Sequence, residues 1–210
     1  MRRTVLLLAA MILSLVAASG VAYAATVSNG GFEAGDLGGW TAKKQEGSSG
    51  RWFAYSGTTS PNGAPIAAPP VGEFAATTDQ NEPSSQVLYK NIKLAAGKKH
   101  TLSFYVYYQN SPGSFATPNT LNFNGPGDNQ QYRVDVMRPS AGAFSVRRAD
   151  VLARVFRTEV GDPGTLAPTR LTYNLTPFAG KTVRLRFAQV DNMGNFLASV
   201  DQVKVSSQSR

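Results

Sequence analysis

The stretch Asn29–Trp40 reads NGGFEAGDLGGW, and near the other end of the chain Phe196–Val205 reads FLASVDQVKV. The first stretch predicts a strand, a glycine-rich turn and an aromatic anchor, because closely spaced glycines favour tight turns. The second stretch is mostly apolar with a single acid, Asp201, and predicts a strand. The fold is therefore expected to begin and end in β structure.

The chain between these stretches consists of short runs of Val, Phe, Tyr and Leu separated by Gly, Pro, Asn and Ser, which is typical of strands. The clearest run, 99–109, has bulky residues on both sides and predicts a central strand. Runs 131–137 and 181–190 alternate, which predicts one buried and one solvent-facing side. Segment 150–157 fits a strand or a short helix. Further strands are predicted at 26–33, 39–45, 51–55, 72–77, 85–94, 169–175 and 196–205.

About eleven short strands with no convincing helix predict an all-β fold, an antiparallel β-sandwich of the jelly-roll type. Three long loops, 56–71, 110–129 and 158–168, interrupt the strands and are expected to be functional or mobile. The composition is the same on both sides of each loop, so residues 25–210 are predicted to form a single domain.

Residues 1–24 have the features of a secretory signal peptide. Arg2 and Arg3 form a basic leader, Val5–Val16 is an apolar run, and Ala22–Ala24 is a small-x-small cleavage site. The apolar run is too short for a membrane span, and no later stretch is long and apolar enough. The mature protein is therefore expected to be secreted and extracellular, to begin near Ala25 and to have no membrane span.

The charge of the mature chain is positive and unevenly placed. The sequence has no cysteine, so its stability cannot come from disulfides. Without Arg2 and Arg3 there are 19 basic and 13 acidic residues, and 12 of the basic residues fall within 100–210. This excess favours an anionic polymer outside the cell, although solvated arginines on exposed strand faces would give the same count. Export argues against nucleic acid as a partner.

Several segments together resemble the galactose-binding-like β-sandwich of the carbohydrate-binding module type. They are Asn29–Glu33 with Gly39–Thr41, Gly72–Ala76, Ser85–Phe104, Phe178–Phe187 and Ser199–Val203. The resemblance spans nearly the whole mature chain. It implies a jelly-roll sandwich whose first and last strands lie together, a carbohydrate as the class of partner, and a structural calcium ion.

Three acids are the candidate calcium ligands. The resemblance places Glu33 and Asp201 near one edge of the fold, with Asp36 as a weaker third ligand. Calcium takes six to eight oxygen ligands, which carboxylates and backbone carbonyls supply. In the alternative interpretation, Glu33 caps a turn, Asp201 pairs with a Lys or Arg, and Asp36 is a turn residue.

Aromatic residues with a neighbouring amide are the candidate carbohydrate contacts: Trp52, Tyr55, Tyr105, Tyr107 and Gln109. An aromatic face can pack against the apolar side of a sugar ring. In the alternative interpretation, the tyrosines form a second buried face beneath the 110–129 loop. Trp40, by contrast, stands where the family has a core residue.

The sequence offers little for catalysis. The only histidine, His100, starts a predicted strand and is expected to be structural or exposed rather than a general base. There is no cysteine, nucleophile elbow or spaced carboxylate pair. The expected function is a secreted, non-catalytic binding module for carbohydrate or a cell-envelope polymer, acidic polymers included. The alternatives are an extracellular structural or adhesion protein without a small ligand, and an unrecognised carbohydrate-active enzyme.

Overall fold

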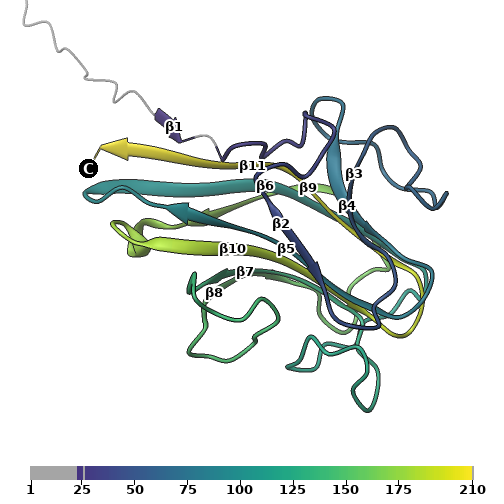
Figure 1. Ribbon diagram of the computed structural model, residues 1–210. Coiled ribbons are helices and arrows are strands. Elements are labelled where there is room, and N and C mark those ends of the chain that lie inside the picture. The colour runs from purple at the N-terminus through teal and green to yellow at the C-terminus, as the bar shows by residue number, and fades with distance from the viewer. Residues whose placement is uncertain (1–22, 26, 210) are drawn as a thin grey trace, which may run out of the picture.

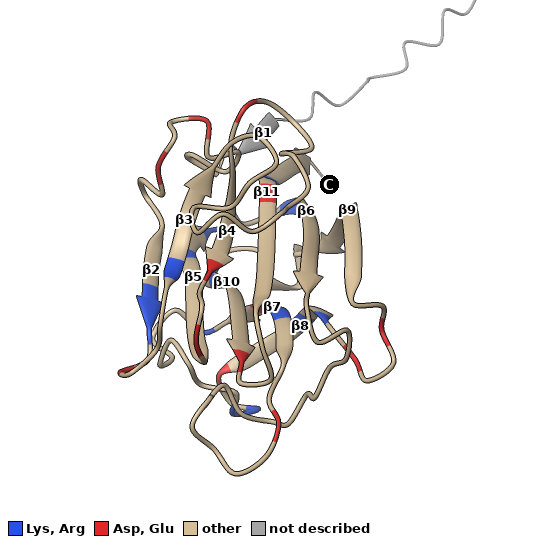
Figure 2. Ribbon diagram, turned by 90° about the vertical axis from the view of Figure 1, so that its right-hand side faces the viewer, with Lys and Arg blue, Asp and Glu red and all other residues tan. Residues whose placement is uncertain are grey.

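The computed structural model describes residues 23–25 and 27–209, which form two antiparallel sheets packed face to face (Figure 1). Sheet A has the order β3 (Arg51–Tyr55), β4 (Ala75–Asp79), β11 (Phe196–Ser209), β6 (Lys98–Asn110) and β9 (Thr165–Asn174), and β1 (Tyr23–Ala25) pairs with the end of β11. Sheet B has the order β2 (Thr41–Lys44), β5 (Ser84–Lys93), β10 (Thr182–Asp191), β7 (Gln131–Met137) and β8 (Val151–Arg157). Figure 2 shows β3, β4, β11, β6 and β9 of sheet A from left to right.

The prediction of an all-β antiparallel sandwich is confirmed. Within the described ranges, the only helical segment is one 3₁₀ turn, η1 (Thr176–Phe178), and none is long and apolar enough to cross a membrane. Segment 150–157, which left strand and helix open, is β8. The predicted signal peptide falls almost wholly on residues 1–22, which lie outside the described residues.

The strand predicted over 26–33 is wrong, because residues 27–33 form turns. Asn29 and Phe32 have φ angles of 50° and 58°, in the left-handed region that a paired strand does not use. The core explains these turns: Phe32 is fully buried, and its ring lies 5.6 Å from that of Trp40. Trp40 is buried and donates a hydrogen bond from Nε1 to the Asn29 carbonyl at 2.9 Å, as expected for a core anchor.

The main core lies between the two sheets. Phe104 of β6 meets Phe187 of β10 edge to face at 5.5 Å, and Trp40 packs 6.0 Å from Phe187. Aliphatic residues of both sheets surround these rings. Aromatic and aliphatic burial of this extent supplies stability that disulfides cannot provide in a chain without cysteine.

The outer faces of both sheets are also covered, each by a long loop. On sheet A, Ile66 of the 56–71 loop packs with Tyr55, Tyr107 and Leu197. On sheet B, the 110–129 loop places Leu121 and Phe123 against apolar residues of β5 and β10, namely Val87, Ala188 and Val190. The sequence suggested that the 110–129 loop covers the face of sheet A that carries the tyrosines. That is wrong, because the 56–71 loop covers it.

The solvent-facing side predicted for 131–137 and 181–190 is wrong as well. Arg133, Asp135 and Arg186 on the outer face of sheet B are at most 1% exposed. Arg133 donates two hydrogen bonds of 2.8 Å to Asp135, and Arg186 lies 2.6 Å from the same carboxylate. Arg186 also donates to carbonyls of the 138–150 loop, which therefore lies across this face. These arginines hold a loop and are not solvated.

Candidate functional site

The first segment of the fold lies against the last strand, as the resemblance implied. The Val203 amide donates to the Gly30 carbonyl at 2.7 Å. A Cβ atom on Gly30 would lie 2.1 Å from the Val203 carbonyl oxygen, so only glycine fits at this position. This close approach puts Glu33 and Asp201 in the same part of the molecule.

Glu33 and Asp201 are neighbouring carboxylates whose charges interact, and the charge of Lys204 also acts on Asp201. Asp201 is fully buried; its Oδ1 accepts a hydrogen bond from the Gln202 amide at 2.5 Å, whereas its Oδ2 has no partner. Burial raises the pKa of Asp201 to about 7, and the charge of Glu33 adds to the effect. Glu33 accepts a hydrogen bond from the Glu73 amide at 2.9 Å. In the part of the chain that the structure describes, neither acid forms an ion pair.

Asp36 is not brought to this pair. Its Oδ1 accepts hydrogen bonds from the Gly38 amide at 2.8 Å and from Asn29 Nδ2 at 3.2 Å, which makes it a turn residue. Across the described residues, no group of three His, Asp or Glu side chains is arranged to hold a metal ion. The prediction of Asp36 as a third ligand therefore finds no support in the geometry, while Glu33 and Asp201 stay together.

The predicted aromatic platform is not on the surface. Trp52 is 2% exposed and packs 6.5 Å from the Tyr132 ring. Tyr55 and Tyr107 are 4% and 1% exposed, and their hydroxyls lie 2.6 Å apart beneath the 56–71 loop. Burial raises the pKa of both tyrosines. None of these three rings presents a face for a sugar, because Trp52 belongs to the core between the sheets and the 56–71 loop covers Tyr55 and Tyr107.

The two other predicted contact residues, Tyr105 and Gln109, are half-buried on β6. They stand on the same face of sheet A as Tyr107, two residues away on either side. Without an exposed Tyr107 between them, they do not form a continuous platform. His100 is structural, as expected: it is 2% exposed, and its ring nitrogens contact the Ser207 hydroxyl and the Ala95 carbonyl, both at 2.8 Å.

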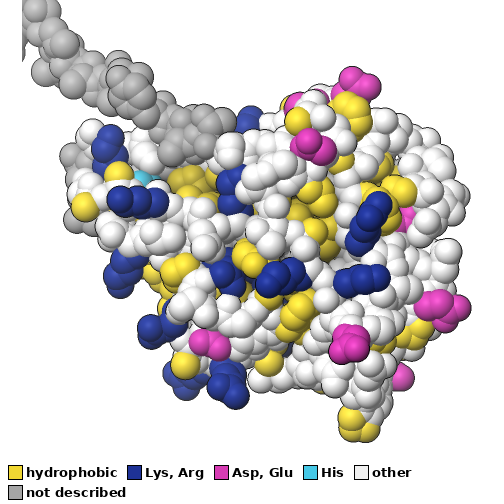
Figure 3. All heavy atoms as spheres, viewed as in Figure 1, with side chains coloured by type: hydrophobic (Ala, Val, Ile, Leu, Met, Phe, Trp, Pro, Cys, Tyr) yellow, Lys and Arg dark blue, Asp and Glu magenta, His cyan; other side chains and the backbone are white. Residues whose placement is uncertain are grey.

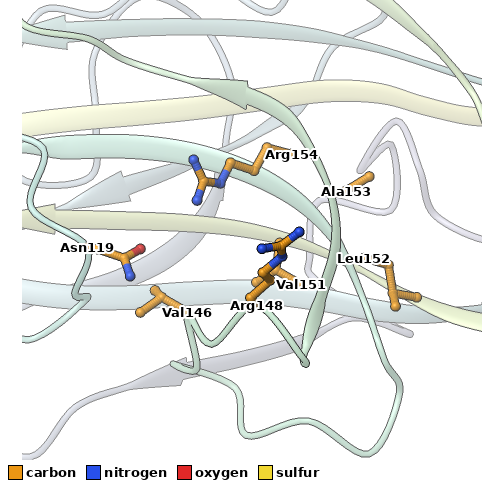
Figure 4. Close-up of a pocket in the computed structure, with 7 residues that line it drawn as sticks. All are labelled: Asn119, Val146, Arg148, Val151, Leu152, Ala153 and Arg154. Carbon is orange, nitrogen blue, oxygen red and sulfur yellow. The ribbon is translucent and has the colours of Figure 1, made fainter.

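Two open cavities lie beside the edge strand β8 and share Leu152; we call them the β8 cavities. The first, of about 450 Å³, is lined by Asn119, Val146, Arg148, Val151, Leu152, Ala153 and Arg154. The second, of about 490 Å³, is lined by Arg138, Pro139, Leu152, Phe178, Lys181, Thr182 and Val183. In Figure 4 Asn119 and the guanidinium group of Arg154 lie on the left, Arg148 lies in the middle, and Leu152 lies on the right.

The β8 cavities are strongly basic. Four cations line them, all exposed, and no acid does: Arg138, Arg148, Arg154 and Lys181. The side chains of Arg148 and Arg154 make no hydrogen bond or ion pair with any described residue. Figure 3 shows basic side chains over the left and middle of that face, with most acids at its upper and right margins. An anion entering these cavities would meet unpaired guanidinium groups.

Sequence reasoning missed this site. The arginine excess of the second half was noted, but Arg148 and Arg154 were not distinguished from Arg184 and Arg186. The adjacent pair Arg147–Arg148 before β8 was the one local signal for exposed basic residues.

No protein-family model and no curated protein matches the sequence. Solved structures share the fold. The carbohydrate-binding module TmCBM61, in complex with β-1,4-galactotriose, is 13% identical with a TM-score of 0.51, covering 88% of this chain and 98% of that one. The K3 cleaved adhesin domain of Lys-gingipain from Porphyromonas gingivalis is 15% identical with a TM-score of 0.53, covering 88% and 99%.

A Stig cyclase from Fischerella sp. TAU shares the same fold, with 18% identity, a TM-score of 0.50 and coverage of 90% of this chain and 100% of that one. A binding module, an adhesin domain and an enzyme thus have this architecture in common. The chain has the β-sandwich fold of these structures, and its function has to be argued from its own residues.

Proposed function

We propose that this protein is an extracellular, non-catalytic module that binds an acidic polysaccharide in the β8 cavities. The observation that supports this most directly is the set of four exposed cations around two adjoining cavities that contain no acid. A guanidinium group matches a carboxylate or sulfate with two parallel hydrogen bonds, which makes arginine well suited to acidic sugars.

The shape and the remaining lining residues favour a polymer over a single small anion. The cavities adjoin at Leu152 and together extend along the edge strand β8, with room for more than one sugar ring. Asn119 can exchange hydrogen bonds with sugar hydroxyls, and Leu152 and Phe178 offer apolar surface to a ring face. The shared fold with TmCBM61, a module solved with a galactose oligosaccharide, supports carbohydrate as the class of ligand.

Calorimetry with a polygalacturonate oligosaccharide and a neutral galactan oligosaccharide of equal length tests the proposal. The double variant Arg148→Gln/Arg154→Gln should bind the acidic sugar at least tenfold more weakly at 50 mM NaCl. The control, Arg170→Gln, removes the same kind of charge from an exposed position on β9 of sheet A and should bind like the wild type. Equal binding by wild type and double variant would refute the assignment.

We also propose that Glu33 and Asp201 hold a structural calcium ion. The support is a buried carboxylate oxygen without a partner beside a second carboxylate, with no cation paired to either among the described residues. Such an ion would tie the start of the fold to its last strand. It would add stability by mass action, since it binds the folded state alone.

The burial of Trp52, Tyr55 and Tyr107 favours a second candidate function, an adhesion or structural protein without a small ligand. Without these rings at the surface, a protein partner is favoured over a neutral sugar. Failure of the wild type to bind any polysaccharide in the calorimetric experiment would favour this second function.

A further inference from the structure

Asp191, at the end of β10, is a buried carboxylate without a counter-ion. It is 2% exposed and forms no ion pair within the described part of the chain. Its Oδ2 accepts one hydrogen bond of 3.3 Å from Gln80, and its Oδ1 has no partner. An unpaired buried charge lowers the stability of the fold. A proton, a water molecule or a cation bound to the carboxylate removes this cost. Burial raises the pKa of Asp191 to about 7, while the neighbouring amide groups of Gln189, Gln80 and Ser84 act in the opposite direction.

The strand register places further oxygen atoms on the same side of sheet B. Gln189 is two residues before Asp191 on β10, and Gln86 is directly opposite Gln189 on β5. Side chains two residues apart, and those of directly paired residues, share one face of a sheet. This inner face is apolar further along, at Phe187, and turns polar at the end of the sandwich.

The amide nitrogens of these glutamines are already used, which leaves their oxygens free. Gln86 donates to the Ser84 hydroxyl at 2.6 Å and to the Ser49 carbonyl at 3.2 Å, and Gln189 donates to the Phe196 carbonyl at 3.4 Å. The side-chain oxygens of Gln86 and Gln189 are buried and accept no hydrogen bond, and the same holds for that of Asn195. One carboxylate oxygen and three amide oxygens are thus left unsatisfied at this end of the sandwich.

A cavity gives access to this end. It measures about 250 Å³ and is lined by Asn81, Glu82, Pro83, Asp191, Asn192, Met193, Gly194 and Asn195. No Lys or Arg lines it, although the chain as a whole has a net charge of +8. The only charged groups at the cavity are therefore the carboxylates of Asp191 and Glu82.

We propose that this cavity is a calcium site, with the Asp191 carboxylate and the side-chain oxygen of Asn195, which both line it, as its protein ligands. Calcium is the cation that this donor set fits, because it accepts neutral amide oxygens and keeps several waters at flexible geometry. Magnesium demands a stricter octahedron, and zinc prefers nitrogen and sulfur. The ion would join the end of β10 to the turn that carries Asn195. This site is separate from Glu33 and Asp201 and does not depend on polysaccharide binding.

The test measures calcium binding by calorimetry in an Asp201→Asn background, which removes the first calcium site. With CaCl₂ up to 10 mM, a range that covers the roughly millimolar affinities of extracellular calcium modules, one site should remain. Adding Asp191→Asn should weaken it at least tenfold, whereas Asp128→Asn, at an exposed position, should not change it. MgCl₂ should bind at least tenfold more weakly than CaCl₂.

A gain-of-function variant keeps the test decisive if Asp191→Asn folds poorly. Gln189→Glu adds a second carboxylate on the same face and should tighten calcium binding several-fold in the Asp201→Asn background. The proposal is overturned if no calcium binds in that background, if binding is unaffected by both Asp191→Asn and Gln189→Glu, or if magnesium binds equally well. In the first of these cases, water molecules satisfy the buried oxygens instead.

Discussion

Asp135 and Asp191 are both buried acids of sheet B, yet their surroundings differ completely. In the middle of the sheet, Asp135 receives hydrogen bonds from Arg133 at 2.8 Å and from Arg186 at 2.6 Å. At the end of β10, Asp191 has only uncharged amide groups beside it, those of Gln80, Gln189 and Ser84, and no ion pair among the described residues. Asp201 on β11 resembles Asp191 in this respect. The middle of the fold neutralises its charges internally, whereas these two acids at its ends have no ion pair among the described residues.

The largest expected effect comes from breaking the internally neutralised region. Arg186→Met should lower the free energy of unfolding by ~3–5 kcal/mol, because a buried carboxylate loses one of its two cations. Urea denaturation followed by tryptophan fluorescence measures this. Arg154→Met, at an exposed position on β8, is the matched control and should change stability by less than about 0.5 kcal/mol. Equal effects of the two substitutions would show that the buried arginines contribute no more than surface ones.

Calcium should have the next largest effect on stability, and this effect should depend on the acids at the ends of the sandwich and not on Asp135. At a concentration one hundred times Kd, an ion bound by Glu33 and Asp201 stabilises the fold by about 2.7 kcal/mol. Melting curves in chelator and in excess CaCl₂ should therefore differ by several degrees. Glu33→Gln should remove most of the calcium-dependent rise in melting temperature that comes from the Glu33–Asp201 site. A calcium shift that survives undiminished in both Glu33→Gln and Asp201→Asn would disprove the first site.

The two unpaired acids should also make stability depend on pH. In metal-free protein, Asp191 and Asp201 keep their protons up to about pH 7, whereas in the unfolded chain they lose them near the ordinary value of 3.8. The folded state binds more protons between these values, so stability falls as pH rises. We expect the free energy of unfolding to decrease between pH 5 and pH 7 and to level off by about pH 8.

The double variant Asp191→Asn/Asp201→Asn should flatten this pH profile, because neither amide titrates. Urea denaturation at several pH values, after passage over a chelating resin, gives the comparison. A profile that stays equally steep in the double variant would assign the dependence to other groups.

The smallest effect on the fold, and a selective one on binding, is expected in the β8 cavities. Arg138→Gln should leave the melting temperature unchanged and weaken polygalacturonate binding by roughly two- to fivefold, as for a partly screened surface charge. Affinity should also fall with added NaCl, and less steeply in the variant than in the wild type. Binding that is insensitive to salt in both proteins would exclude an electrostatic role for this arginine.

The strands and their sandwich arrangement could be predicted from the sequence, because alternation and turn residues are local signals. The pairing of Glu33 with Asp201 came from the family resemblance. Burial could not be predicted in the same way. Trp52 reads like a surface aromatic after Ser48–Arg51 until the fold places Tyr132 against it.

The arginines of β10 show the same limit. Arg184 and Arg186 alternate with apolar residues just as solvent-facing arginines do, and only the position of the 138–150 loop buries them. A one-dimensional pattern records which side of a strand is polar, but it does not record which loop covers that side. The basic cavities at β8 were overlooked for the same reason, since their arginines are distinguished only by remaining uncovered.

Two buried arginines anchor the 138–150 loop by hydrogen bonds, and this anchoring affects the affinity for a polysaccharide in the β8 cavities. Arg184 donates to the carbonyls of Pro139 and Ala141, and Arg186 donates to those of Ala143 and Ser145. The backbone that leads to Arg148 is thus held in place before any ligand arrives. A ligand that meets a preorganised loop loses little free energy to ordering it. Loosening these anchors should therefore slow the encounter with the polymer and shorten its residence time, although neither anchor arginine lines the cavities.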